Sequence, residues 1–207
     1  MKERPILFSG SMVRAILSGA KTQTRRVIKP QPWFMPEAYD HGPQWAWAYS
    51  WPAWEVGNGA VWGTKFSGEL AEQDYFREHC PYGVPGDQLW VRETWAALHP
   101  GTDDVMREVD PRPPICSLAY RATDERSING PWRPSIFMPR WASRITLEVV
   151  SVRVQRLQDI SHEDGKAEGL DSLDGFALLW DRINEKRGYG WQVNPWVWAV
   201  EFRAVEA

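Results

Sequence analysis

The stretch GAKTQTRRVIKP, residues 19–30, crowds a lysine, two threonines and two arginines into six consecutive positions. A threonine hydroxyl is a poor nucleophile unless a base beside it takes its proton. Lys21 can be that base only if burial or neighbouring cations lower its pKa, and Arg25 and Arg26 supply such cations. The pairing of Lys21 with Thr24 is therefore compatible with base-assisted nucleophilic catalysis.

The same residues also have a purely structural interpretation. A lysine just past a helix end interacts favourably with the helix dipole, and threonine at alternate strand positions reflects ordinary β-propensity. The two arginines would then be solvated or bind a phosphate. Taken alone, the residue types favour this structural interpretation, because isolated polar clusters are usually structural.

The elements around this stretch predict a helix-to-strand corner. Residues 6–8 form a short apolar strand, Ser9 or Ser11 can cap a helix, and Gly19 stands where a helix C-cap is expected. Apolar residues recur at helical spacing at 12, 13, 16 and 17. Residues 22–28 alternate as a strand, on which Thr22, Thr24 and Arg26 share one face.

The remainder of the chain reads as strands with few helices. A turn at 85–87 leads into a strand over 89–93, and residues 144–157 give two apolar faces whose parity slips at 149/150, which predicts a bulge or bend. Helices are expected from Ser161 to Gly169 and around 176–183, before a closing strand over 196–202. We expect an α+β fold: a small, bent, mostly antiparallel β-barrel with flanking helices, in one domain over 1–207.

Two irregular stretches, at about 31–84 and 99–140, are expected to be ordered insertions rich in Trp and Pro. The chain holds 14 tryptophans, most of which should fill the core, but large aromatic side chains also form walls on which bases stack. Five tryptophans in the first insertion are candidates for such a wall: Trp45, Trp47, Trp51, Trp54 and Trp62.

Several motifs together resemble the ASCH family, which has a PUA-like β-barrel fold. They are LSGAKTQTRR near the start, PGDQLWVRETW in the middle, LQDISHEDGKAEGL followed by LWDRIN, and the final NPWVWAVEF. The chain is most similar to a longer, tryptophan-rich branch that is common in phage and prophage sequences. Most of 31–80 and 99–130 has no counterpart in the compact members, which are about half this length.

The resemblance implies a function and a set of site residues. Compact bacterial members are amidohydrolases that cleave N4-acetylcytidine to cytidine and acetate. Their proposed catalytic lysine, threonine and glutamate correspond to Lys21, Thr24 and Glu168, with Glu163 as the nearest rival for the glutamate. Such chemistry needs a nucleophile, a base, an acid for the leaving nitrogen and donors for the oxyanion. A glutamate beside Lys21 would oppose the lowering of the lysine pKa that the base role requires.

Other candidate site residues follow from position. Thr22 and Arg26 share the face of Thr24, and Arg92 and Glu93 are expected to line one side of the barrel, as substrate contacts or as a buried ion pair. A zinc site built from His79, Cys80, His99 and Cys116 lacks any recognised ligand spacing, so we expect neither metal nor cofactor.

Composition separates the two functions that we consider. The formal net charge is −3, whereas a nucleic-acid polymer binder usually carries a basic stripe. We therefore expect an enzyme with a small nucleoside substrate, and keep an RNA- or DNA-binding module of PUA-like fold as the alternative. Two cysteines and the absence of a signal-like or membrane-spanning apolar run indicate a cytoplasmic protein, which we expect to be a monomer.

Overall fold

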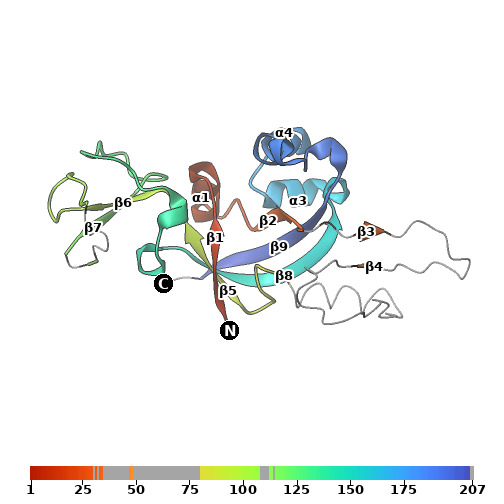
Figure 1. Ribbon diagram of the computed structural model, residues 1–207, viewed down its shortest axis with the longest axis horizontal. Coiled ribbons are helices and arrows are strands. Elements are labelled where there is room, and N and C mark those ends of the chain that lie inside the picture. The colour runs from red at the N-terminus through yellow and green to blue at the C-terminus, as the bar shows by residue number, and fades with distance from the viewer. Residues whose placement is uncertain are drawn as a thin grey trace, which may run out of the picture.

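A five-stranded sheet forms the centre of the computed structural model, which describes residues 1–29, 31, 33–34, 47–48, 80–107, 112–113 and 115–205 (Figure 1). The strand order is β1-β5-β8-β9-β2. The strands are β1 (Glu3–Leu7), β2 (Gln23–Val27), β5 (Gln88–Arg92), β8 (Thr146–Arg156) and β9 (Trp196–Val205). The chain is therefore α+β, as its alternating and helical patterns predict.

This sheet corrects the expectation of a closed, mostly antiparallel barrel. β1 pairs with β5 in parallel, while the β5–β8, β8–β9 and β9–β2 pairs are antiparallel. Within the described residues β1 and β2 lie at opposite edges of the sheet and do not pair with each other, so the sheet stays open. Alternation along a strand fixes which side chains face the core, but it does not specify which strand lies beside it.

The corner at the start of the chain forms as predicted. Ser9 caps α1 (Gly10–Leu17) by accepting a hydrogen bond from the N–H of Met12, and Val13 and Ile16 face the core. The helix ends at Ser18, and Gly19 follows with a φ of 75°, a left-handed conformation that favours glycine. β2 then begins at Gln23, so Lys21 lies between the helix end and the strand.

The parity slip at 149/150 is confirmed as a bulge. β8 is one continuous strand against β9, and its register shifts between Val149 and Ser151. The extra residue, Val150, is half exposed, whereas Val149 and Val152 are buried. The bulge thus lets the apolar residues before it and those after it face the same core, although their parity differs.

Two helices follow β8 and lie over the β2–β9 end of the sheet (Figure 1). Ser161 and Asp164 form a reciprocal capping box that starts α3 (His162–Ala167), and Ser172 caps α4 (Leu173–Asn184). Phe176 and Trp180 on the inner face of α4 pack with Leu157, Ile160 and Val197. No helix in the described part of the chain is long and apolar enough to cross a membrane.

The 99–140 stretch, together with the residues just before it, contains regular structure that the sequence did not predict. β6 (Trp95–Leu98) pairs with β7 (Ser117–Tyr120), and short 3-10 turns follow at Ser135–Phe137 and Arg140–Ala142. These elements enclose a cluster of their own around Trp95, Met106 and Met138. In the first insertion, β3 (Trp33–Phe34) and β4 (Trp47–Ala48) form a two-stranded pair, and most other residues of 31–84 lie outside the described part.

Candidate active site

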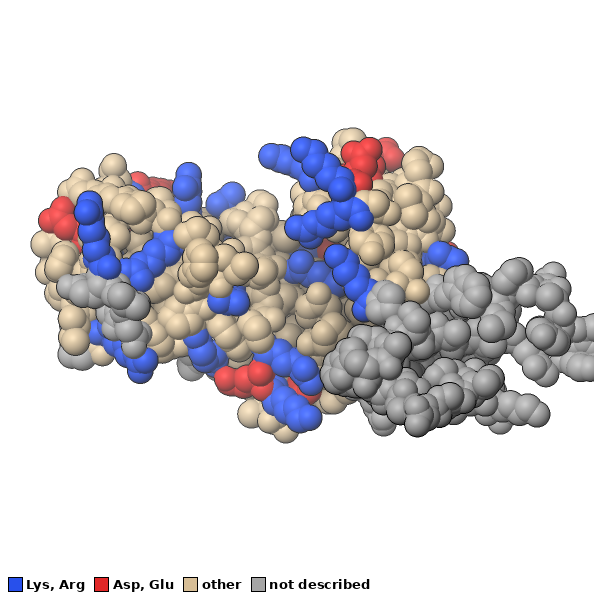
Figure 2. Space-filling view, viewed as in Figure 1, with Lys and Arg blue, Asp and Glu red and all other residues tan. Residues whose placement is uncertain are grey.

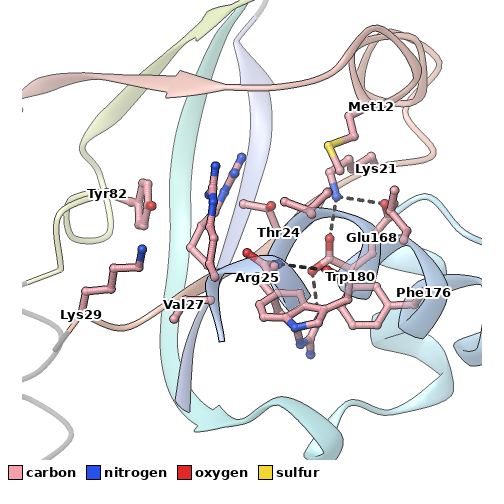
Figure 3. Close-up of a pocket in the computed structure, with 15 residues that line it drawn as sticks. Met12, Lys21, Thr24, Arg25, Val27, Lys29, Tyr82, Glu168, Phe176 and Trp180 are labelled. Atoms are coloured by element: carbon pink, nitrogen blue, oxygen red, sulfur yellow. Dashed lines mark hydrogen bonds and ion pairs between the residues drawn. The ribbon is translucent and has the colours of Figure 1, made fainter. Parts of the chain in front are cut away.

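A cavity of about 280 Å³ opens between β2, α1 and α4. Polar groups from two distant segments meet in it: Lys21 and Thr24 from the corner before and within β2, and Glu168 from the end of α3 (Figure 3). Apolar and aromatic side chains form much of its wall, among them Met12, Val27, Tyr82, Phe176, Leu179, Trp180 and Ile183. Its volume is close to the lower limit of the usual range for small-molecule sites, which is about 300 Å³.

The ammonium of Lys21 contacts Glu168 through two oxygens. Lys21 Nζ donates to Glu168 Oε2 at 2.6 Å and to the main-chain oxygen of Glu168 at 2.9 Å. Both side chains are almost fully buried, at 1% and 5% exposure. The two residues are 147 positions apart in the chain, so this ion pair is a product of the tertiary structure.

Main-chain contacts hold the two residues together. Lys21 and Glu168 form an isolated antiparallel bridge, and the N–H of Lys21 donates to the oxygen of Ala15 in the last turn of α1. Gly169, with a φ of 82°, ends α3 directly against the lysine. A Cβ added at Gly169 would lie 3.2 Å from Lys21 Cβ and 3.1 Å from Ala15 Cβ. A glycine is therefore required here both by the backbone conformation and by the close approach.

The pKa of Lys21 lies below its ordinary value of 10.5. Burial is the largest cause, because it disfavours the charged ammonium, and the charges of Arg25 and Arg26 act in the same direction. The charge of Glu168 and its hydrogen bond act in the opposite direction but do not outweigh burial. Burial thus outweighs the carboxylate, and the pKa of Lys21 shifts in the direction that a role as base requires.

Thr24 supplies a buried hydroxyl at the same cavity. It is 3% exposed, and none of the described residues forms a hydrogen bond with its side chain. In Figure 3 its hydroxyl lies on the side of the cavity that holds Lys21 and Glu168. A base, a hydroxyl and a carboxylate thus line one small volume, and these are the groups that nucleophilic catalysis uses. Lys21 Nζ contacts Glu168 and not Thr24, so substrate binding would have to bring the amine and the hydroxyl together.

A network of alternating positive and negative side chains extends from Glu168 away from the cavity. Arg25 Nη1 donates to Glu168 Oε1 at 3.2 Å, and Arg25 Nη2 donates to Asp164 Oδ2 at 2.8 Å. Arg153 continues the chain, from Asp164 Oδ1 at 3.1 Å to Glu201 Oε1 at 3.0 Å. The network fixes α3 on the sheet and orients both oxygens of Glu168, so it has a structural role as well as a positioning one.

Not every candidate from the sequence reaches the cavity. Arg26 lines it, whereas Thr22 is exposed and contributes main-chain hydrogen bonds to Ala167 and Phe202. Glu163, the rival of Glu168, is exposed on α3. The structure thus brings Glu168, not Glu163, to the lysine.

Arg92 and Glu93 belong to a different region of the molecule. Glu93 is 1% exposed and accepts two hydrogen bonds from Arg144, at 2.9 and 3.1 Å. Arg92 donates to the main-chain oxygens of Met138 and Ile136. Glu93 thus forms a buried ion pair with Arg144 and not with Arg92, and neither Arg92 nor Glu93 is among the residues that line the cavity.

Several cavity residues were missed by sequence reasoning. Lys29 follows β2, Tyr82 lies in the turn before β5, and Arg187 follows α4. Charged residues at such element ends usually face solvent, so the sequence did not indicate Lys29 and Arg187 as site residues. Phe176 and Trp180 fit the apolar face of an amphipathic helix, a pattern that predicts core and not a site. Of the five tryptophans predicted to stack on a ligand, four lie outside the described residues, and for Trp47 only the backbone is described.

Cys80 and Cys116, from the zinc alternative, are buried in separate apolar clusters. Within the described residues no three His, Cys, Asp or Glu side chains are grouped as metal ligands. Searches against family models, curated proteins and solved structures find no match to this chain.

Proposed function

We propose that the protein is an amidohydrolase that removes the acyl group from N4-acylated cytosine nucleosides, converting N4-acetylcytidine to cytidine and acetate. The observation that carries the proposal is the buried contact of Lys21 with Glu168 in a cavity that Thr24 also lines. These are the three residues that the ASCH resemblance implies, and Glu168 comes from a segment far from the K-T-x-T stretch that holds the other two.

The roles follow from the chemistry of each group. Neutral Lys21 takes the proton from the attacking hydroxyl, which forms a C–O bond to the acyl carbon. The C–N4 bond then breaks, and the amine of cytidine leaves with the proton that Lys21 took up, passed directly or through Glu168. If Thr24 attacks, water hydrolyses the threonine ester to acetate; if Thr24 only positions a water, acetate forms directly. A mass increase of one acetyl group on Thr24 after rapid quenching distinguishes the first route from the second.

The same proposal includes the finer fold assignment, an ASCH domain of the PUA-like class. Its support is local: the helix-to-strand corner with K-T-x-T and the later helix that ends in glutamate meet at one cavity. The small volume of that cavity favours a nucleoside-sized ligand over a folded RNA. Retention on heparin at physiological salt would instead favour the nucleic-acid-binding alternative.

The direct test is to incubate the purified protein with N4-acetylcytidine, without added metal, and to measure cytidine by chromatography. Residues that act as a unit lose activity non-additively, so Lys21→Ala and Thr24→Ala should each lower kcat by several orders of magnitude, and the double variant little further. Thr22→Ala is the matched control, because Thr22 lies on the same segment but is exposed. Folded Lys21 and Thr24 variants with near-normal turnover would refute the catalytic assignment, and activity lost with EDTA and restored by zinc would refute the metal-free route.

A further inference from the structure

More cationic side chains line the cavity than the proposed catalytic residues require. Five cationic side chains line it, Lys21, Arg25, Arg26, Lys29 and Arg187, against one carboxylate, Glu168. Lys21 and Arg25 both form ion pairs with Glu168. Among the described residues no carboxylate forms an ion pair with the other three, although the charge of Glu168 also acts on Arg26.

Two of these three cations, Arg26 and Lys29, contact neutral groups. Arg26 Nη2 donates to the main-chain oxygen of Leu7 at 2.6 Å, and its guanidinium lies 5.2 Å from the ring centre of Phe8. Lys29 Nζ lies 5.1 Å from the ring centre of Tyr189. Contacts of this kind position a cation without neutralising it, so the charge remains available to a ligand.

The cavity therefore has two chemically different ends. In Figure 3, Lys29 and Tyr82 lie on the side opposite Lys21 and Glu168. Burial raises the pKa of Tyr82, so its hydroxyl stays protonated and able to donate a hydrogen bond. Figure 2 shows Lys and Arg side chains gathered on the flank of the α3–α4 lobe, beside the hollow that separates it from α1.

A ligand that fits both ends has a reacting group at one end and an anion at the other. Like charges around one small cavity repel each other, and a bound anion relieves this repulsion. A phosphate carries a charge between about −1.5 and −2 at neutral pH and accepts several hydrogen bonds from arginine and lysine. The enclosed volume suits one nucleotide and not a polymer.

We propose that the cavity selects nucleoside monophosphates over nucleosides, with Arg26, Lys29 and Arg187 as the phosphate-binding residues and Tyr82 as a further donor. This inference rests on the proposed function for the identity of the base, because the cations by themselves specify only the anion. The preferred substrate is then an N4-acylated cytidine monophosphate.

A binding experiment tests the ligand class without any turnover. Affinities for cytidine 5′-monophosphate and for cytidine are measured by calorimetry with the full chain, and the monophosphate should bind roughly tenfold tighter or better. Lys29→Gln and Arg187→Gln, both at exposed positions, should each reduce this preference by about threefold to tenfold. Lys186→Gln is the matched control, because it removes the same charge next to Arg187 but does not line the cavity.

The preference should also follow the ionisation of the phosphate, whose second pKa is about 6. It should increase as the pH rises through this value and should weaken as salt is added. Equal affinity for the two ligands, or a preference that Lys186→Gln reduces as much as Arg187→Gln, would overturn the proposal. Inorganic phosphate competing as well as the monophosphate, or a short cytidine-containing RNA binding more tightly than the monophosphate, would also overturn it.

Turnover separates this inference from the hydrolase proposal. Hydrolysis of N4-acetylcytidine and its 5′-monophosphate with equal kcat/KM leaves the hydrolase standing and refutes the phosphate selectivity. No hydrolysis of either compound, together with charge-dependent binding of cytidine monophosphate, refutes the hydrolase and supports the phosphate site.

Discussion

Replacing Glu168 by glutamine tests the electrostatics of the site independently of any activity. The substitution keeps the shape of the side chain and one carbonyl acceptor but removes the charge that faces Lys21 at 2.6 Å. The lysine then retains the main-chain oxygen of Glu168 and no carboxylate among the described residues. In a side chain that is 1% exposed, the neutral amine becomes the favoured form.

The magnitude follows from the protonation of the unfolded chain. Unfolded Lys21 has an ordinary pKa of 10.5 and is charged below it. A lysine that is neutral when folded must therefore lose a proton on folding, and this lowers the free energy of unfolding by about 1.4 kcal/mol for each pH unit below 10.5. Near pH 7 the limit is therefore about 5 kcal/mol. The wild-type protein already bears part of this cost because its Lys21 pKa is lowered, so we expect Glu168→Gln to destabilise by about 2–5 kcal/mol.

Proton linkage determines whether the free energy of unfolding rises or falls with pH. Between the lowered pKa of folded Lys21 and 10.5, the unfolded chain binds more protons, so the free energy of unfolding rises with pH. In Glu168→Gln the pKa of Lys21 is lower still, so the free energy of unfolding of this variant begins to rise at a lower pH than that of the wild type. The destabilisation should therefore shrink as the pH rises towards the Lys21 pKa of the wild type and stay constant above it. Lys21→Met lacks this titration, and Glu168 keeps its ion pair with Arg25. We expect a cost of about 1–2 kcal/mol near neutral pH, and this cost should grow above the Lys21 pKa of the wild type, where only the wild type gains stability.

Urea unfolding followed by tryptophan fluorescence measures all the variants, with exposed Glu163→Gln on the same helix as the control. The double variant Lys21→Met/Glu168→Gln should be little less stable than Lys21→Met alone, because the buried lysine that causes the cost is gone. A Glu168→Gln cost that grows as the pH rises, or a double variant as unstable as the sum of the singles, would refute the reasoning.

Three further predictions follow from the same contacts. The kcat/KM for N4-acetylcytidine should rise with pH as Lys21 loses its proton and reach its plateau below 10.5; a rate that falls over this range contradicts the base role. Gly169→Ala should destabilise the protein by about 2 kcal/mol or more and reduce activity. Gly188 is the control, because it has a φ of 80° but no atom within 4 Å of an added Cβ, so Gly188→Ala should cost about 1 kcal/mol. Equal costs in urea unfolding would show that crowding against Lys21 is unimportant. Burial raises the pKa of Cys80 to about 11, so its thiol should react with a chromogenic disulfide only when the protein unfolds, and fast labelling of the native protein would contradict this.

Local sequence signals predicted the local structure well. Ser9 and Gly19 delimit the first helix, Ser161 caps the helix that ends at Glu168, and the parity slip at 149/150 is a bulge. Each of these features depends on residues within a few positions of one another, where capping hydrogen bonds and side-chain alternation decide the outcome. The placement of Lys21 at a helix-to-strand corner is predictable for the same reason.

Long-range contacts decided what local signals could not. The open sheet depends on β1 pairing with β5, some eighty positions away, and no alternation within either strand specifies that partner. The same limit applies to Arg92 and Glu93, whose alternation placed them on a strand but did not reveal Arg144 as a partner.

The sequence by itself determined which elements form and where their polar side chains stand: a lysine at a corner, a threonine on the next strand and a glutamate at the end of a later helix. Only the tertiary structure decided that Lys21 and Glu168 are buried against each other and that Arg26, Lys29 and Arg187 surround the same cavity. The physical reason is that the pKa of a lysine and the charge of a cavity depend on burial and on neighbours through space, and both are set by packing between segments up to 147 residues apart.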